Sequence, residues 1–280
     1  MRTLITGANG MLARAAAEYC RSIGDDVTAS TRQDLDIADI DSVRMAFTDT
    51  RPEIVLNCAA YTNVDGAETN IETAFKANAI GPENLALICD EFGVKLVTVS
   101  TDYVFDGEKG EPYIDTDRPN PLGVYAASKF EGEKRVAAAN TDAIIVRSGW
   151  IYGKGGTNFL SVMPELLAIG KQLNVISDNF GTPTSAKDLA RRMREIGESS
   201  VRGIVHVTNA GNGTSNLGYG QKVCEIGGFD PMLVRGVPCS ELKRPAPRPI
   251  DSRLRSTDLS KFELEPLQDW ESALREFLQN

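Results

Sequence analysis

Residues 2–15 read RTLITGANGMLARA, and this stretch decides the fold. Its first five residues predict a β-strand, and the residues after Gly10 predict an α-helix. A glycine turn between a strand and a helix leaves backbone N–H groups free beside the positive end of the helix dipole, and both attract a pyrophosphate. We expect Gly7 to form the tight turn, Gly10 to allow the close approach of phosphate, and Ala13 to pack the helix against the strand. The motif therefore predicts a dinucleotide site, with a tight turn that binds nothing as the alternative.

Short apolar runs and amphipathic stretches alternate through the first half of the chain. Such alternation predicts βαβ units and a parallel sheet with helices on both faces. Beyond the strand and helix that flank the glycine turn, the expected strands cover residues 25–30, 53–59, 94–100 and 142–147, and the expected helices cover 39–47, 70–92 and the surroundings of 125–129.

After Trp150 this alternation stops, and segments rich in glycine and proline appear. Long loops of this kind commonly carry substrate contacts. The predicted architecture is an α/β protein, with a Rossmann-type doubly wound parallel sheet and a smaller α+β substrate-binding lobe. We expect the dinucleotide-binding domain in residues 1–150, with return segments within 178–208, and the substrate lobe mainly in residues 151–280.

Composition limits the classes of partner. Hydrophobic residues make up 41% of the chain and charged residues 25%, with a net charge of −9. A negative chain without basic stripes argues against nucleic-acid binding. No segment approaches the roughly 18 apolar residues that a membrane span needs, and the N-terminus leads straight into the glycine motif, which leaves no room for a signal peptide. The sequence predicts a cytoplasmic protein with neither nucleic-acid nor membrane partners.

Cysteine and histidine give little reason to expect a metal. Five cysteines occur without a C-x-x-C pair, so reduced thiols are expected. The only histidine is His206, and one histidine supplies neither a histidine-based metal cluster nor a Ser-His-Asp triad by itself. We expect His206 to be structural and predict no metal site.

The end of the second strand indicates the cofactor. An acidic residue there would hold the ribose 2′-hydroxyl of NAD, but this chain has Ser30, Thr31 and Arg32. Hydroxyls and a guanidinium suit a 2′-phosphate, so NADPH is the predicted cofactor, and NADH stays open as a second one. Asp36 and Ile37 are expected to close over the adenine. A merely solvated Arg32 is the alternative.

The run GVYAASKFEGE holds the candidate catalytic pair, Tyr125 and Lys129. Four residues apart on a helix, the two side chains lie on one face. An ammonium near a phenol is expected to lower the tyrosine pKa from its usual value of about 10, and such a tyrosine can exchange a proton with a carbonyl or an alcohol. Thr101 ends an apolar strand at the sheet edge where ligands bind, so its hydroxyl could donate to a substrate oxygen; an ordinary turn residue is the alternative.

Several runs together carry a family resemblance: TGANGML, LNCAAYTNVDGAE, STDYVFDG, RSGWIYG, DNFGTPT and RPIDSRL. Their order and spacing resemble the extended short-chain dehydrogenase/reductase superfamily and, within it, the dTDP-4-dehydrorhamnose reductases. The resemblance implies that Tyr125 donates the proton, that Lys129 tunes it and holds the nicotinamide ribose, and that Thr101 binds the keto oxygen. It implies further cofactor contacts at Gly10, Met11, Leu12, Ala60, Tyr61, Thr62 and Val99, and sugar-nucleotide contacts at Asp102 and Trp150.

The implied reaction is the NAD(P)H-dependent reduction of the C4 ketone of dTDP-4-dehydro-6-deoxy-L-mannose to dTDP-L-rhamnose, in a monomer or homodimer. Two alternatives stay open: a reductase of another nucleotide-linked 4-keto-6-deoxy sugar, and a regulatory subunit that binds cofactor without catalysis. The chain departs from the usual family pattern at Ala126, Gly149, Asn179 and Asp251, and it has Ala15 where some relatives place a glutamate that holds magnesium.

Overall fold

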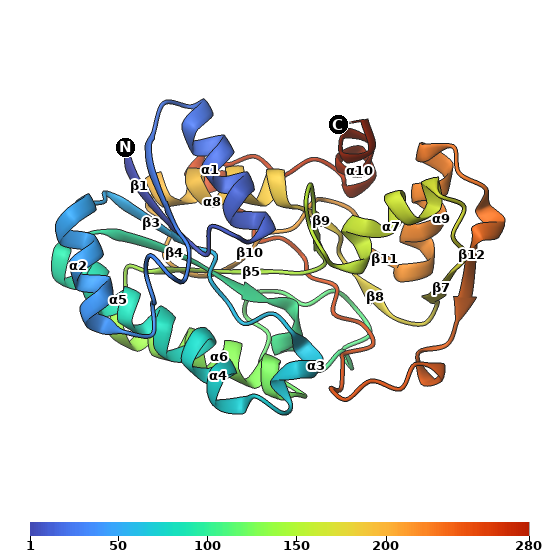
Figure 1. Ribbon diagram of the computed structural model, residues 1–280, viewed down its shortest axis with the longest axis horizontal. Helices are drawn as coiled ribbons and strands as arrows, with labels where there is room; N and C mark the ends of the chain where they lie inside the picture. Colours follow the sequence, from blue (N-terminus) through green and yellow to red (C-terminus); the bar gives the residue numbers. More distant parts are fainter. Residues whose placement is uncertain (280) are drawn as a thin grey trace.

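A six-stranded parallel sheet forms the centre of the larger half of the molecule (Figure 1). The computed structural model describes residues 1–279. The sheet has the strand order β10-β5-β4-β3-β1-β2, with β1 at Arg2–Thr6, β2 at Asp26–Ser30, β3 at Ile54–Asn57, β4 at Lys95–Thr101, β5 at Ile144–Ser148 and β10 at Gly203–His206. The chain winds outward from β1 in two directions, so the direction of winding changes between β1 and β3. Ligands bind beyond the carboxyl ends of the strands at such a point, and the predicted doubly wound α/β fold is confirmed.

Helices cover both faces of this sheet (Figure 1). One face packs against α1 (Met11–Ser22) and α8 (Ala186–Glu198), and the other against α2 (Ile40–Thr50), α5 (Gly81–Phe92) and α6 (Val124–Ala139). The buried side of α1 carries only small residues, Ala13, Ala16, Ala17 and Cys20. Small side chains let α1 approach β1 and α8 closely, which fixes the position of the glycine turn at its start.

The helix that the sequence predicts over residues 70–92 has an interruption. The structure has α4 at Ile71–Phe75, a π-helical turn at Lys76–Ile80 and then α5, after the short α3 at Val64–Ala67. A Cβ on Gly132 of α6 would lie 2.1 Å from the carbonyl oxygen of Asn78. The π turn therefore presses directly on α6, and a hydrophobic pattern cannot distinguish such a single wide turn from a continuous helix.

The smaller lobe has its own core and lies at the right of Figure 1. Its helices are α7 (Phe159–Ala168), α9 (Asn216–Gly227) and α10 (Trp270–Gln279). Its strands pair as β7 (Leu173–Ile176) with β12 (Val234–Val237), β8 (Phe180–Gly181) with β11 (Thr214–Ser215), and β6 (Ile151–Tyr152) with β9 (Thr184–Ser185). Short 3-10 helices cover Asp102–Val104, Pro231–Leu233, Cys239–Glu241 and Ser260–Phe262.

The chain passes between the two halves more than once. After entering the lobe at β6, it returns to supply α8 and β10 to the larger half. Leu259 and Leu267, close to the C-terminus, also belong to the core of the larger half. None of the helices within residues 1–279 is long and apolar enough to cross a membrane.

Candidate active site

The glycine turn has the backbone geometry that a pyrophosphate site requires. Gly7 has a φ of +75°, a conformation that glycine adopts without strain. A Cβ at this position would lie 2.8 Å from the backbone of Ala59, in the loop after β3. Gly10 is exposed and begins α1 with no capping side chain and no acidic residue in the first turn. The first N–H groups of α1 are therefore available to an anion, so the residues present fit the phosphates of a dinucleotide.

Contacts from the smaller lobe hold this turn in place. Met11 and Leu12 are partly exposed just after it. The Arg14 guanidinium donates to the carbonyl of Asn9 and, at 2.8 Å, to the carbonyl of Gly155. The Ser161 hydroxyl lies 3.5 Å from the Met11 sulfur. The predicted pyrophosphate residues are thus anchored from both halves of the molecule.

The three predicted cofactor residues at the end of β2, Ser30, Thr31 and Arg32, differ in their surroundings. Ser30 is buried, and the Thr31 hydroxyl donates to Asp34 at 2.7 Å, while the Thr31 N–H donates to the same carboxylate at 2.9 Å. The expectation that no carboxylate lies at the end of this strand is therefore wrong, because Asp34 folds back onto it. The Arg32 side chain is 73% exposed and only 3.7 Å from Asp36 at its nearest approach. Of the three predicted residues, Arg32 keeps its polar end open to a ligand.

Asp36 and Ile37 lie in a turn that is fixed from α5. The Asp36 carboxylate accepts the N–H of Ala38 at 3.0 Å. The Ile37 carbonyl accepts from the Asn84 side chain at 3.0 Å, and the Ile37 side chain is buried against Gly81. Ile37 thus forms part of the wall of the core beside the predicted adenine position.

Asn78 is a site residue that the sequence did not indicate. Its side chain accepts the N–H of Tyr61 at 2.8 Å and donates to the Tyr61 carbonyl at 3.1 Å. It also donates to the Ser128 hydroxyl at 3.0 Å. Asn78 therefore joins the loop of Ala60, Tyr61 and Thr62, along which the cofactor is expected to run, to the helix that carries Tyr125. The π turn places Asn78 there, and such turns are frequent at functional sites.

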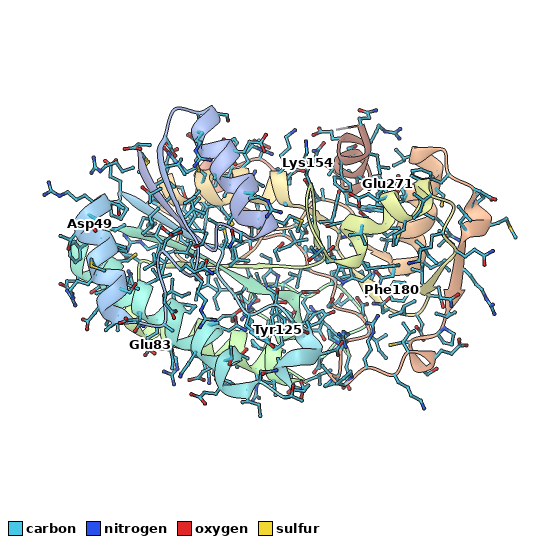
Figure 2. The ribbon with its side chains drawn as sticks, in the orientation of Figure 1. Asp49, Glu83, Tyr125, Lys154, Phe180 and Glu271 are labelled. Carbon is cyan, nitrogen blue, oxygen red and sulfur yellow. The ribbon has the colours of Figure 1, made fainter. Side chains whose placement is uncertain are left out.

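The structure brings Thr101, Tyr125 and Lys129 together at the carboxyl end of β4. The Lys129 ammonium is buried and donates to the Val99 carbonyl at 2.6 Å. Tyr125, which keeps part of its surface accessible, shares a hydrogen bond with the Thr101 side chain. Figure 2 shows Tyr125 on the side of the larger half, with Phe180 across from it in the smaller lobe. The three predicted catalytic side chains thus occupy one place between the two halves.

The pKa of Tyr125 differs from the expectation. Burial raises it to about 12, and the hydrogen bond with Thr101 opposes the rise. Burial lowers the pKa of Lys129 to about 8, although the Glu133 carboxylate acts in the opposite direction. The prediction that Lys129 lowers the pKa of Tyr125 is wrong for this arrangement, because burial raises that pKa and the Lys129 ammonium is bound to the Val99 carbonyl. Tyr125 therefore keeps its proton at neutral pH.

Asp102 and Trp150 lie beside this group. The Asp102 carboxyl is buried and accepts hydrogen bonds from Thr101 at 3.1 Å and from Ser252 at 2.5 Å. A Cβ on Gly149 would lie 2.5 Å from the Asp102 carboxyl carbon. The departure at Gly149 is therefore what allows Asp102 to lie over the backbone here. Trp150 follows with a φ of +46°, which is rare for a bulky residue.

Positive charge reaches the site from the segment KRPAPR at residues 243–248. Arg248 donates to both oxygens of Asp65 on α3, at 2.9 and 2.8 Å, and forms a hydrogen bond with Tyr103. The Tyr103 ring packs edge-on against Tyr125 with 6.1 Å between centroids. Arg244 is exposed and acts electrostatically on the same tyrosine. No sequence motif indicated a role for these arginines, although the basic run KRPAPR is apparent in the sequence.

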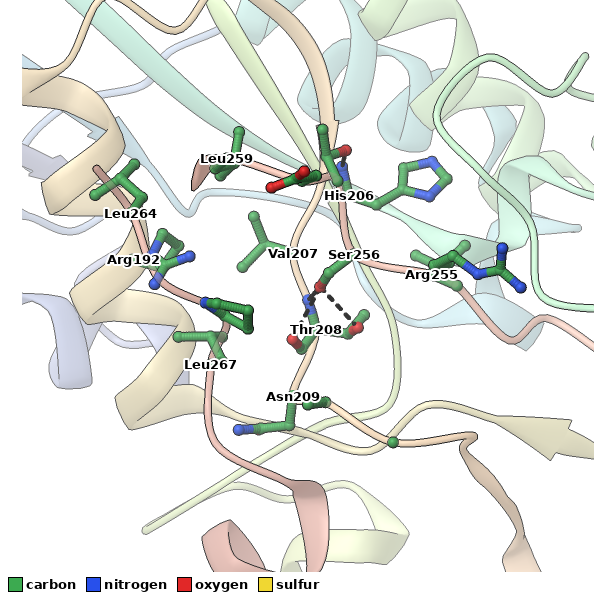
Figure 3. Close-up of a pocket in the computed structure, with 16 residues that line it drawn as sticks. Arg192, His206, Val207, Thr208, Asn209, Arg255, Ser256, Leu259, Leu264 and Leu267 are labelled. Carbon is green, nitrogen blue, oxygen red and sulfur yellow. Dashed lines mark hydrogen bonds between the residues drawn. The ribbon is translucent and has the colours of Figure 1, made fainter. Parts of the chain in front are cut away.

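His206 and a cavity next to it lie apart from the predicted site. Burial lowers the pKa of His206 to about 4, and the positive charge of Arg147 acts in the same direction. A cavity of about 300 Å³ separates α8 from the segments 206–211 and 254–267, and Figure 3 shows Arg192, Leu259, Leu264 and Leu267 around it. It contains none of the predicted site residues, and Arg192 is already bonded to Glu195 and to the Glu265 carbonyl.

Within the described residues, no group of three or more His, Cys, Asp or Glu side chains could hold a metal ion. The five cysteines are free thiols, and burial raises the pKa of Cys20 to about 11 and that of Cys58 to about 12. Thiols with raised pKa values are poor nucleophiles at neutral pH.

Known proteins share this architecture. Residues 1–280 match the protein family described as RmlD substrate binding domain. The chain is 41% identical over 279 residues to the dTDP-4-dehydrorhamnose reductase of Mycobacterium tuberculosis (strain ATCC 25618 / H37Rv), with 98% of this chain and 91% of that protein covered. It is 40% identical over 283 residues to the probable dTDP-4,6-dihydroxy-2-methyloxan-3-one 4-ketoreductase of Streptomyces antibioticus, with 99% and 94% covered.

A solved structure gives the same result in three dimensions. The crystal structure of dTDP-4-dehydrorhamnose reductase from Bacillus anthracis in complex with NADP superposes with a TM-score of 0.94 at 34% identity, covering 99% of this chain and 98% of that one.

Proposed function

Since the chain belongs to the dTDP-4-dehydrorhamnose reductase family, we propose that it is an oxidoreductase that uses NADPH to reduce the C4 ketone of a dTDP-4-dehydro-6-deoxyhexose. The preferred reaction is dTDP-4-dehydro-L-rhamnose to dTDP-L-rhamnose. The observation that carries the proposal is the meeting of Thr101, Tyr125 and Lys129 at the edge of the sheet that also presents the open glycine turn.

The chain's own residues account for the proton. A bound nicotinamide supplies hydride to C4. Tyr125 donates its phenolic proton to the C4 oxygen, which requires that the phenol is protonated beforehand. The raised pKa of Tyr125, about 12, meets this requirement at neutral pH. A secondary alkoxide is a stronger base than the phenolate, so the transfer is favourable, and Thr101 adds a second hydrogen bond to the same oxygen.

Lys129 links proton donor and cofactor. Its ammonium is anchored on the Val99 carbonyl and lies one helical turn after Tyr125. From this position it would hold the nicotinamide ribose, and its positive charge would stabilise the phenolate that forms as Tyr125 gives up its proton. Lys129 therefore acts in the transition state, where negative charge develops.

The two halves would divide the ligands between them. Residues 1–150, together with α8 and β10, would bind the cofactor, with Gly7, Gly10, Met11 and Leu12 at the pyrophosphate and Arg32 at the 2′-phosphate. The smaller lobe would bind the sugar nucleotide, with Trp150 and Asp102 at the sugar. Arg244 and Arg248 supply the positive charge that a diphosphate requires in a chain of net charge −9.

A second sugar substrate has specific support. The Streptomyces antibioticus relative is described as a probable 4-ketoreductase of a different dTDP-linked sugar, and it covers as much of this chain as the rhamnose-forming relatives do. The fold and the catalytic group are common to both reactions. The configuration at C3 and C5 of the natural substrate is therefore the property that the assay must separate.

The test is consumption of NADPH, followed as loss of its absorbance, when purified protein receives dTDP-4-dehydro-6-deoxy-L-mannose. The same protein is then given dTDP-4-dehydro-6-deoxy-D-glucose, and each product is identified by NMR. Turnover of the first sugar to dTDP-L-rhamnose supports the preferred reaction, and turnover of the second alone supports the other sugar. A regulatory subunit would bind NADPH and consume none with either sugar, which would sink the proposal.

A further inference from the structure

A continuous row of hydrogen bonds extends from the proton donor into the protein. Tyr125 bonds to the Thr101 hydroxyl, Thr101 donates to the Asp102 carboxyl at 3.1 Å, and Ser252 donates to the other Asp102 oxygen at 2.5 Å. The Thr101 oxygen also accepts the N–H of Tyr103 at 3.2 Å. Every polar atom in this row thus has a defined donor or acceptor role.

These roles depend on whether Asp102 carries a proton. A hydroxyl has one proton to donate and two lone pairs to accept with. Beside an ionised Asp102, Thr101 donates its one proton to the carboxylate and accepts the N–H of Tyr103. It then cannot also donate to the phenol oxygen in the hydrogen bond that lowers the pKa of Tyr125, so the phenol can only donate to Thr101. The C4 oxygen of the substrate is expected to receive the Tyr125 proton and a hydrogen bond from the Thr101 hydroxyl. In this state neither group points at the substrate, because the Thr101 proton points toward Asp102 and the Tyr125 proton points toward Thr101.

Protonation of Asp102 reverses the direction of these hydrogen bonds. A neutral carboxyl donates to the Thr101 oxygen, which then accepts from Asp102 and from Tyr103 N–H and has no lone pair left for Tyr125. The Thr101 proton and the Tyr125 proton are both released toward the same open position. We propose that Asp102 functions as a neutral carboxylic acid, a positioning residue that directs the Thr101 and Tyr125 protons onto the substrate oxygen. This inference rests on the proposed function.

The surroundings of Asp102 favour the neutral form. The carboxyl is 3% exposed and lies on the α-carbon of Gly149. The groups around it are neutral: Thr101 and Tyr103 on its own segment, Tyr125 on α6 and Ser252 near the C-terminus. Within residues 1–279, no ammonium or guanidinium forms an ion pair with it. The positive groups of the neighbouring elements have other partners, since Lys129 is bound to Val99 and Arg248 to Asp65.

Loss of water raises the pKa of this carboxyl to about 6, even against its hydrogen bonds from Ser252 and Thr101. The phosphates of two bound nucleotides add negative charge nearby, and negative charge raises a carboxyl pKa further. The acid form is therefore accessible near neutral pH in the complex, and it is lost as the pH rises.

The kinetic test compares pH profiles of kcat for the wild type, Asp102→Asn and Asp102→Leu, with both substrates saturating. A deuterium effect from labelled NADPH identifies the pH range in which hydride transfer limits the rate. In the wild type, kcat should fall by up to tenfold per pH unit above the pKa of Asp102. Asparagine keeps a donor for Thr101 and an acceptor for Ser252 but does not titrate, so Asp102→Asn should lack that decrease. Leucine offers neither group, and kcat should fall at every pH.

Two controls separate positioning from a merely structural role. Asp106→Asn alters a carboxyl of the same loop that bonds to Tyr113 instead of the site, and it should keep the wild-type profile. In a Thr101→Val background, Asp102→Asn should produce no further change in the profile, because Asp102 acts through Thr101. Thermal unfolding of each variant shows whether it is folded at the assay temperature.

An infrared measurement tests the same idea without turnover. Wild type minus Asp102→Asn spectra, recorded at pH 6 with NADP⁺ and dTDP bound, should contain the carbonyl band of a protonated carboxylic acid. Absence of that band, or an Asp102→Asn profile with the same decrease as the wild type, would overturn the proposal. Failure of the wild type to reduce any dTDP-4-keto sugar would instead refute the proposed function, and the infrared band would still decide the state of Asp102.

Discussion

The indole ring of Trp150 lies against the α-carbon of Gly181. A Cβ on Gly181 would come within 2.1 Å of the indole Cε2 and Nε1 atoms. The backbone of Trp150 is held at a φ of +46°, a conformation that costs a non-glycine residue on the order of 1 kcal/mol or more. Close packing on Gly181 is what stabilises this conformation, and it fixes the ring at the border between the two halves.

Gly181→Ala should therefore displace the Trp150 ring. We expect kcat/KM for the sugar nucleotide to fall at least about tenfold, equivalent to roughly 1.4 kcal/mol, while NADPH affinity stays unchanged. Steady-state kinetics and fluorescence titration with NADPH measure the two quantities. Gly110→Ala is the control for backbone strain alone, because Gly110 has a φ of +78° and a Cβ there would meet no other atom within 4 Å. An unchanged KM in Gly181→Ala would show that Trp150 does not bind the sugar.

Tyr125→Phe keeps the ring that packs on Tyr103 and removes the phenolic proton. Turnover should fall by about a hundredfold or more, the usual effect of losing a positioned acid, and NADPH affinity should stay near normal. Tyr103→Phe is the matched control, since it removes a phenol from the partner ring outside the proton path. Turnover like that of the wild type in Tyr125→Phe would rule out Tyr125 as the donor.

Lys129→Met should reduce both turnover and NADPH affinity, because one ammonium serves the phenolate and the ribose. The pKa of Lys129 is lowered to about 8, so the charged form is present below that pH and is lost above it. Wild-type affinity for NADPH should accordingly decrease as the pH rises through about 8, and Lys129→Met should show no such decrease. Isothermal titration between pH 6 and pH 9 tests both statements; normal affinity in the variant would contradict them.

Arg32→Ala should remove most of the preference for NADPH over NADH. A hydrogen bond to a charged group contributes about 1.5–3 kcal/mol, or about tenfold and upward in affinity. NADH affinity should not change. Asp36→Ala, which frees Arg32 from its 3.7 Å neighbour, should preserve or increase the preference. Equal dissociation constants for the two cofactors in the wild type, at one salt concentration, would refute the assignment.

Asp102 should also affect the pH dependence of stability. Its pKa in the folded protein is raised from 3.8 to about 6 by burial. Its contribution to the unfolding free energy is therefore fully present below about pH 4 and is lost as the pH rises through about 6. Roughly two pKa units correspond to about 3 kcal/mol, which Asp102→Asn should remove. Denaturant unfolding should show the variant gaining stability relative to the wild type between pH 4 and pH 7.

Asp106→Asn serves as the comparison, because its unfolding free energy relative to the wild type should change with pH in the opposite direction. The hydrogen bond from Tyr113 lowers the pKa of Asp106, so its contribution is present above the unfolded pKa and is lost as the pH falls. That variant should lose stability relative to the wild type as the pH rises from the acid side. The same slope in both variants would mean that Asp102 does not titrate as its burial indicates.

Local sequence signals were sufficient for the frame of the fold. Strands β1 to β5 follow from short apolar runs, and the glycine turn follows from the backbone freedom of Gly7. Both signals are local, because they depend only on residues that are close together in the sequence. The pair Tyr125 and Lys129 is also local, because its spacing on one helix fixes a shared face.

Features that depend on tertiary contacts could not be predicted in this way. The π turn at Asn78 exists because α6 packs against it at Gly132, and no hydrophobic period signals that contact. Asp34 folds back onto Thr31 through hydrogen bonds that composition does not reveal. The predicted direction of the Tyr125 pKa shift was wrong. The shift depends on how much water the folded site removes from the phenol, and the spacing between Tyr125 and Lys129 does not show that.

The return of the chain to build β10 limits how this protein can be recombined. The edge strand at Gly203–His206 pairs with β5 but is separated from it in sequence by much of the smaller lobe. A chimera spliced once after Trp150 would join a sheet to an edge strand and a helix α8 from a different parent. Exchange of sugar specificity between relatives therefore requires at least three junctions, one after Trp150 and one on each side of the α8–β10 segment, so that the cofactor half keeps its own last strand.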